Sequence, residues 1–311
     1  MSEKFSGAFI RELRKKFGAG TVVVKSSVIK MNMDDFYEYV ISITDTDNFT
    51  CYIDYTKYES AYCNSMANDK IIPILADEAI NYFNKRKASE QWFNEAGYEE
   101  IKDKLYPVIV DTVQNTLFID EKVNREFMSL SVLAAYDMTD SNNQYLYTEY
   151  IYQKDISHWN VSADEVIDQA IANDKHNSVC TFINRYGIGI INILGHTATK
   201  DDQIIKNIND TISDYNKDTF LLCSNSKFKA SVLLNEEFMQ SVAETIGHDF
   251  YVMPMDNRGV IIETNIDKTL DQYYDIVGMT FMELKIMHPE HALTSTIFRY
   301  RYSKNIMEPL P

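Results

Sequence analysis

The sequence predicts an α+β protein with mixed, largely antiparallel sheets and packed helices. Segments typical of strands and helices alternate without the strict βαβ order of a parallel sheet, and several strand pairs are separated by short turns. Apolar residues make up 45% of the 311 residues, and glycine (10) and proline (6) are scarce. This length suits one or two domains. We therefore predict lobes at 1–104 and 105–311, or one continuous unit.

The first lobe opens with a basic amphipathic helix. Its apolar residues recur at helical spacing, basic residues fill the positions between them, and Gly18 ends the pattern. The apolar positions are Phe9, Ile10, Leu13 and Phe17. Such a stripe usually packs on a sheet, and a membrane-surface role is the alternative.

The rest of this lobe reads as strands followed by a helix. A valine-rich run at 21–29, alternating apolar residues at 36–44 and a further strand-like run at 49–54 predict an antiparallel meander. A helix should then cover 71–87, because Lys85, Arg86 and Lys87 are typical of a helix C-terminus. Residues 87–104 should form a connector with a short helix.

The second lobe shows strand, turn and capping signals. Strands are expected at 106–113, 125–138 and 145–153, the last two joined by a turn at 140–143. Ser162 and Glu165 form a capping box for a helix at 163–173, and Asp201 caps another helix.

The last third has the clearest pattern. Asn235 and Gly247 delimit a helix as N-cap and C-terminal stop. The expected strands are 220–223, 250–253, 259–263 and 295–302, and a further helix is expected at 267–287.

Charge and targeting signals narrow the class of protein. The net charge is −16, and residues 1–30 carry seven basic and two acidic residues, so the rest of the chain contributes −21. A nucleic-acid binder needs clustered Lys and Arg, so we expect no direct nucleic-acid contact. The sequence has no signal-peptide core, no long apolar run and no cysteine framework. We therefore predict a soluble cytoplasmic protein with no membrane contact.

Candidate chemical motifs are weak. Gly187, Gly189 and Gly195 do not satisfy the dinucleotide-binding pattern. His288 and His291 have a metal-ligand spacing but no third ligand. The sequence thus predicts no catalytic residue, no metal and no cofactor, although a site that forms only in three dimensions stays open.

Several segments together resemble an uncharacterised bacterial family, a domain of unknown function found in Gram-positive gut anaerobes and on mobile elements. The resemblance rests on YPVIVDT, NREFMSLSVLAAYDM, FLLCSN, KASVLL, FTCYIDYTKY and HPEHALTSTIFRYRY, in their order along nearly the whole chain. It implies a shared α+β fold and no established activity. Relatives carry a Ser-Ser-x-His-Glu turn where this chain has Met255 to Gly259. This departure weighs against a catalytic role inherited from the family.

The leading functional prediction is therefore a non-enzymatic protein that binds another protein through an acidic, tyrosine-rich surface. A phage or mobile element acting against host defence would use such a protein, and its partner should present a basic surface. The predicted contact residues lie around one hairpin and are Asp45, Asp47, Tyr55, Tyr58 and Glu59. The alternative is a hydrolase-like or nucleotide-handling enzyme, which would bring His, carboxylate and Arg together in one cleft.

Overall fold

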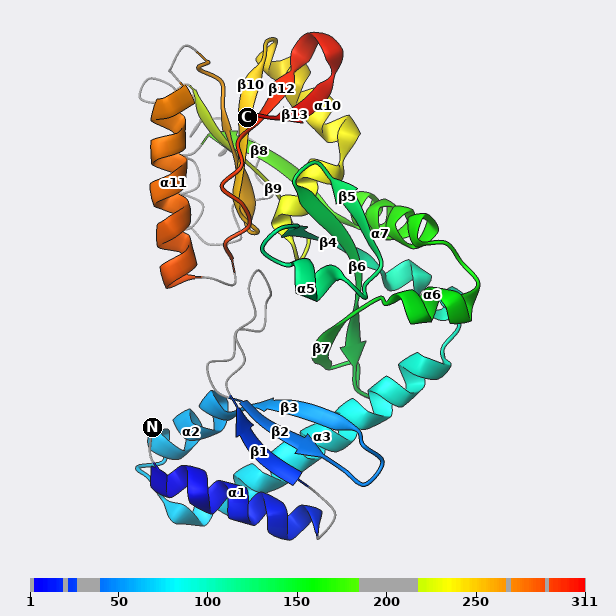
Figure 1. The fold of residues 1–311 in the computed structure, drawn as a ribbon, viewed down its shortest axis with the longest axis vertical. Helices are drawn as coiled ribbons and strands as arrows, with labels where there is room; N and C mark the ends of the chain where they lie inside the picture. The colour runs from blue at the N-terminus through cyan, green and yellow to red at the C-terminus, as the bar shows by residue number, and fades with distance from the viewer. Residues whose placement is uncertain are drawn as a thin grey trace. The chain divides into compact units, whose positions relative to one another are not determined.

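The computed structural model describes residues 3–18, 22–26, 40–184, 218–266, 270–288 and 291–310 (Figure 1). Its helices and antiparallel sheets confirm the predicted α+β class. The chain divides into two compact units, the first comprising Met1–Gly97 and Asp137–Glu149, the second comprising Tyr98–Tyr136 and Tyr150–Pro311. The predicted lobes 1–104 and 105–311 stay a prediction.

The first unit contains the predicted meander and the predicted basic helix. The strands pair in the order β1–β2–β3, and both pairings are antiparallel. Phe9 and Leu13 of the helix are fully buried in the same core as the β2 and β3 side chains, so the apolar stripe packs inside the protein. The bounds are α1 (Glu3–Phe17), β1 (Val22–Ser26), β2 (Val40–Thr44) and β3 (Thr50–Asp54).

A helix that the sequence reading missed follows directly on β3. In α2 (Tyr55–Asn64), the Asp54 carboxylate caps the N-terminus by accepting hydrogen bonds from the backbone N–H groups of Thr56 and Lys57. Its tyrosines face the core at helical spacing, and they are Tyr55, Tyr58 and Tyr62. That spacing, together with an aspartate before it, was the available signal.

The long helix of this unit extends well past its predicted end. After η1 (Asp69–Ile71), α3 (Ile72–Glu95) continues eight residues beyond Lys87. The basic triplet that predicted a C-terminus is instead used in contacts along the helix side, as described below. The segment after it, Ala88–Glu95, contains few residues that disfavour a helix, so nothing local stops α3 at Lys87.

The next sheet has four strands; β4, β5 and the first part of β6 belong to the second unit and pair antiparallel, whereas the end of β6 and most of β7 belong to the first unit. The central strand of this sheet, β6, pairs with β4, β5 and β7. The single strand predicted at 125–138 is wrong, because the chain reverses at Met128, which adopts a positive φ of 59°. The bounds are β4 (Tyr106–Asp111), β5 (Asn124–Phe127), β6 (Leu130–Thr139) and β7 (Tyr145–Tyr150).

Short helices surround this sheet, and α7 packs against β4 and β5. Ser162 caps α7 as predicted, accepting a hydrogen bond from the Glu165 backbone N–H at 3.1 Å. The bounds are α4 (Tyr98–Ile101), η2 (Lys102–Lys104), α5 (Thr116–Ile119), α6 (Gln153–Trp159) and α7 (Ala163–Asn177).

A six-stranded antiparallel sheet in the order β13–β12–β10–β11–β9–β8 completes this unit. The bounds are β8 (Cys180–Asn184), β9 (Thr219–Ser224), β10 (Phe250–Asp256), β11 (Gly259–Glu263), β12 (Phe298–Arg301) and β13 (Ile306–Pro309). Half of the predicted strand 295–302 is present as β12, while η5 (Tyr302–Lys304) and β13 were not predicted.

Three helices accompany this sheet: η4 (Lys229–Leu234), α10 (Glu236–Ile246) and α11 (Leu270–Met287). Asn235 caps α10 through the Phe238 backbone N–H at 3.1 Å, and Gly247 ends it with a φ of 78°, both as predicted. Within the described residues, no helix combines the length and apolarity needed to cross a membrane. The predicted Asp201 helix and the Gly187–Gly195 segment lie outside the described residues.

Candidate functional site

The two predicted contact aspartates are joined to a lysine of their own unit. Asp45 and Asp47 accept hydrogen bonds from Lys87 Nζ at 2.6 and 2.5 Å. Asp45 also accepts the backbone N–H groups of Asp47 and Phe49, which closes the β2–β3 turn. Burial would raise the pKa of Asp45, but these hydrogen bonds hold it below its ordinary value. Asp45 and Asp47 therefore stabilise the β2–β3 hairpin to which they belong.

The three other predicted contact residues lie on α2 and differ in how far their side chains are buried. Tyr55 and Tyr58 are 0% and 3% exposed, so their rings belong to the core. The Phe9 and Tyr58 rings stack at 5.3 Å. Burial raises the pKa of Tyr55 to about 12. Glu59 is half-buried on the same helix. The structure thus places the aspartates at the β2–β3 turn and the three α2 residues after the other end of β3, and it does not bring the five residues onto one surface.

A half-buried arginine occupies the middle of α3. The Arg86 guanidinium carbon lies 3.6 Å from the centre of the Tyr147 ring, a close cation–π contact. Desolvation by burial would lower the pKa of Arg86, but its electron-rich neighbours, Cys51 first among them, raise it above its ordinary value. The guanidinium is thus a permanent cation stacked on an aromatic ring, a strong cohesive contact inside the first unit.

The same side of α3 holds the tip of the β6–β7 hairpin through further contacts. Lys85 Nζ donates to Asp140 at 2.7 Å, and the Ser89 hydroxyl donates to the Thr139 carbonyl at 3.2 Å. The Lys85 hydrogen bond lowers the pKa of Asp140, with help from backbone N–H groups of the turn. Lys85, Arg86 and Ser89 therefore hold the segment Asp137–Glu149 against α3 within this unit.

The thiol nearest to Arg86 is Cys51, and Arg86 does not activate it as a nucleophile. Burial raises the pKa of the Cys51 thiol to about 11, and this outweighs the lowering effect of Arg86. A nucleophilic cysteine needs the opposite shift. The exposed thiol of this unit is Cys63.

A carboxylate and three serines form a network in the second unit. Asp174 of α7 accepts the Ser231 hydroxyl at 2.8 Å, and Ser231 lies 3.0 Å from the Ser226 hydroxyl oxygen. Ser224 continues the chain of contacts to Ser226. Burial raises the pKa of Asp174, although the Ser231 and Ser226 hydroxyls lower it. The network joins α7 to η4, and Asp174 is the acid–base group among its four side chains.

The histidine pair occupies the end of α11 and the loop after it. The His288 and His291 rings lie 6.0 Å apart, and His291 Nδ1 lies 3.2 Å from Asn257 Oδ1. In the adjacent turn, the Asp256 carboxylate is already held by the Arg258 guanidinium at 2.5 Å. Among the described residues, no group of three or more His, Cys, Asp or Glu is arranged to hold a metal ion.

Helix α11 carries an exposed apolar face. The opposite side of this helix is buried against β10 through Tyr273, Val277 and Phe281. Four large apolar residues in its second half are nevertheless exposed by 57% to 73%, namely Met279, Met282, Ile286 and Met287. Three acidic residues on the helix are also exposed, namely Asp271, Asp275 and Glu283. We call this side of α11 the methionine face.

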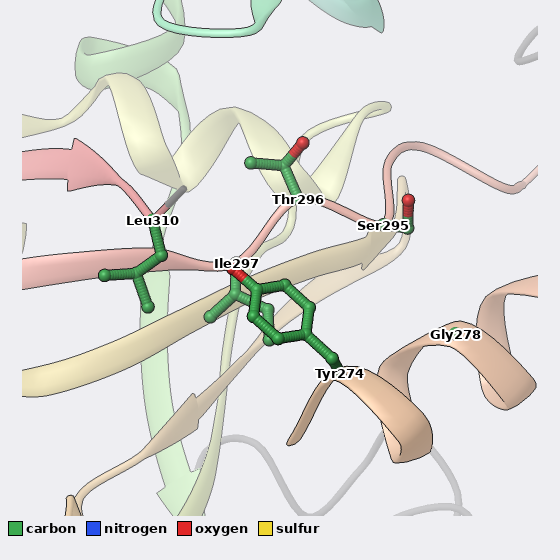
Figure 2. Close-up of a pocket in the computed structure, with 6 residues that line it drawn as sticks. All are labelled: Tyr274, Gly278, Ser295, Thr296, Ile297 and Leu310. Atoms are coloured by element: carbon green, nitrogen blue, oxygen red, sulfur yellow. The ribbon is translucent and has the colours of Figure 1, made fainter. Parts of the chain in front are cut away.

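A hollow of about 310 Å³ lies beside the methionine face (Figure 2). Tyr274 and Gly278 of α11 form one wall, and residues just before β12, with Leu310, form the other. The lining residues are Tyr274, Gly278, Ser295, Thr296, Ile297 and Leu310. A Cβ atom added at Gly278 would meet nothing within 4 Å. The hollow therefore combines apolar walls with hydroxyl groups and carries no charged side chain.

Sequence reasoning missed both the methionine face and the hollow. The α11 sequence is apolar around most of its circumference, so its spacing alone did not distinguish a buried face from an exposed one. The methionines were the available signal, because methionine is common on adaptable binding surfaces.

Comparison with known families and structures identifies the kind of chain without assigning an activity. A family model described as a family of unknown function (DUF5688) matches residues 2–301. The chain therefore belongs to this family. A search of curated proteins and a search of solved structures return no match.

Proposed function

We propose that this protein binds another protein, and that the methionine face of α11 receives a basic amphipathic helix of the partner. The observation that carries the proposal is the exposure of Met279, Met282 and Ile286 at positions i, i+3 and i+7. This spacing is the one by which a helix presents apolar anchors to a partner. The proposed contact replaces water on three large apolar side chains at once.

The chemistry of the face defines the partner. Methionine side chains are flexible and polarizable, so they adapt to apolar side chains of different shapes. The exposed acids Asp271, Asp275 and Glu283 lie around the apolar residues and attract Lys and Arg. The net charge of −16 adds long-range attraction for a basic partner. An anionic membrane would be repelled by the same charges.

The earlier prediction of an acidic, tyrosine-rich contact surface is narrowed by this proposal. Contact of Tyr55 and Tyr58 with a partner stays a prediction, and their burial does not favour it. Contact of Asp45, Asp47 and Glu59 with a partner stays a prediction, as do a cytoplasmic location and a role for a phage or mobile element against host defence.

The proposal is tested with a designed peptide. A fluorescent 20-residue helical peptide with Leu at every third or fourth position and Lys or Arg elsewhere is titrated with the full-length protein. We expect saturable binding in the micromolar range and an association rate that falls as salt rises. Replacement of both Met279 and Met282 by Gln should weaken binding at least tenfold, which corresponds to about 1.4 kcal/mol.

The matched control is Met66→Gln, because Met66 is 94% exposed and lies far from α11 in sequence, in the first unit. This variant should bind the peptide like the unmodified protein. Absence of peptide binding, or equal binding by the Met279/Met282 variant, would refute the proposal. Sedimentation analysis tests whether a second copy of the chain binds the methionine face instead. Self-association that disappears in the Met279/Met282 variant would show that it does.

A further inference from the structure

We infer that the hollow beside α11 is an anchor site for one Trp or Tyr side chain of the bound partner. This inference rests on the proposed function, because it names what the partner must place next to the methionine face. The hollow has a volume of about 310 Å³, at the lower end of the range for ligand pockets. That size suits a single large side chain.

The position of the hollow connects it to the methionine face. Tyr274, Gly278 and Met282 follow one another at intervals of four residues, so they form one row along α11. Tyr274 and Gly278 line the hollow, and Met282 is 57% exposed. A partner helix that covers Met282 therefore has the hollow next to it along the same row. Figure 2 shows Tyr274 and Gly278 on α11, across from Ser295, Thr296 and Ile297.

The lining residues define the chemistry of the anchor. Ile297 is fully buried and packs with Tyr274 and Leu310 in one apolar cluster, which offers dispersion contacts to an aromatic ring. Ser295 and Thr296 add hydroxyl oxygens that can accept a hydrogen bond. Tyr and Trp are the side chains that join a large apolar ring to an N–H or O–H donor. They are also enriched at the energetic centres of protein interfaces.

The uncharged lining of the hollow excludes Arg and Lys of the partner as anchors. The six lining residues carry no charged side chain, so a buried Arg or Lys of the partner would lose its hydration without gaining an ion pair there. Lys and Arg of the partner are instead expected opposite Asp275 and Glu283, which are exposed on the same helix.

The test uses two versions of the basic amphipathic peptide, one with a single central Trp and one with Ala at that position, and a protein variant that fills the hollow. Gly278→Leu places a side chain in the open space, in a helix where leucine is favoured over glycine. Gly278→Ala is the matched control for the change in helix propensity. Ser295→Leu fills the hollow from the opposite wall, at an exposed position, and is used if Gly278→Leu lowers the melting temperature.

We expect the unmodified protein to bind the Trp peptide at least tenfold more tightly than the Ala peptide, and Gly278→Leu to bind both peptides equally. Gly278→Ala should retain most of the difference. If Gly278→Leu keeps the full preference for Trp while the Met279/Met282 variant loses peptide binding, the anchor site is wrong and the proposed function stands. If neither peptide binds the unmodified protein, both are wrong.

Discussion

Replacement of Leu13 by Ala tests whether the basic helix α1 is a structural element of the first unit. Leu13 is fully buried in a cluster that includes Phe5, Phe9 and Ile41. The Phe5 and Phe9 rings stack at 5.2 Å, so rigid aromatic side chains form part of the environment of Leu13. Rigid side chains of this kind relax poorly into the cavity that the removal of the leucine side chain would leave. We expect Leu13→Ala to lower the free energy of unfolding of this unit by about 3 to 5 kcal/mol, in the upper part of the range for Leu→Ala.

The assay must report on one unit, because a chain with two compact units need not unfold in a single transition. Native-state hydrogen exchange followed by mass spectrometry meets this need. A loss of about 3 kcal/mol should accelerate exchange in globally protected amides of α1, β3 and α3 by roughly a hundredfold or more. Peptides from α10 and β10 should keep their protection.

The matched control is Ile74→Ala on α3, because Ile74 is 65% exposed. It should change stability by no more than about 0.5 kcal/mol. The packing argument fails if Leu13→Ala leaves exchange in α1 and α3 unchanged. Loss of liposome binding in that variant, with stability intact, would instead show that the apolar side of α1 faces a membrane.

Three further predictions concern the first unit. A double-mutant cycle with Arg86→Met and Tyr147→Leu should give a coupling energy of about 1 to 2 kcal/mol, as a partly desolvated cation–π pair requires, and a coupling near zero would contradict the stacking. Iodoacetamide at neutral pH should modify Cys63 in the folded protein and Cys51 only after unfolding, as mass spectrometry would show, because Cys51 is buried with its pKa raised to about 11. The pKa of Asp140 is lower in the folded protein than its ordinary value of 3.8, so the ionised carboxylate stabilises the folded state at pH values above 3.8. The difference in unfolding free energy between wild type and Asp140→Asn, measured with urea, should therefore be largest at neutral pH. It should shrink as the pH falls below 3.8.

Local signals predicted many elements well, because those elements obey local rules. Asn235 and Ser162 cap their helices as expected, since a cap is a contact within one turn of chain. Gly247 stops α10 for an equally local reason, its positive φ. The strands of the first meander follow from valine content in β1 and from alternating apolar residues in β2.

The errors arose where distant residues decide the outcome. Lys85, Arg86 and Lys87 look like the end of a helix, but their partners Asp140, Tyr147 and Asp45 come from other segments of the first unit and allow α3 to continue. The reversal at Met128 has no glycine, and pairing between β5 and β6 maintains it. A window of neighbouring residues shows neither the side-chain partners of the basic triplet nor the pairing of β5 with β6.

The candidate site was missed for a related reason, and this reason also supports its function. Helix α11 carries apolar residues on two sides, and only packing against β10 determines that Val277 and Phe281 are the buried ones. A helix that needed only a structural contact could place polar residues at Met279, Met282 and Ile286 without losing its core side. Exposed apolar side chains that serve no core contact favour non-specific association, so clustered ones mark interaction sites more often than they mark neutral surface. The second apolar side of α11 is therefore best explained by a partner that covers it.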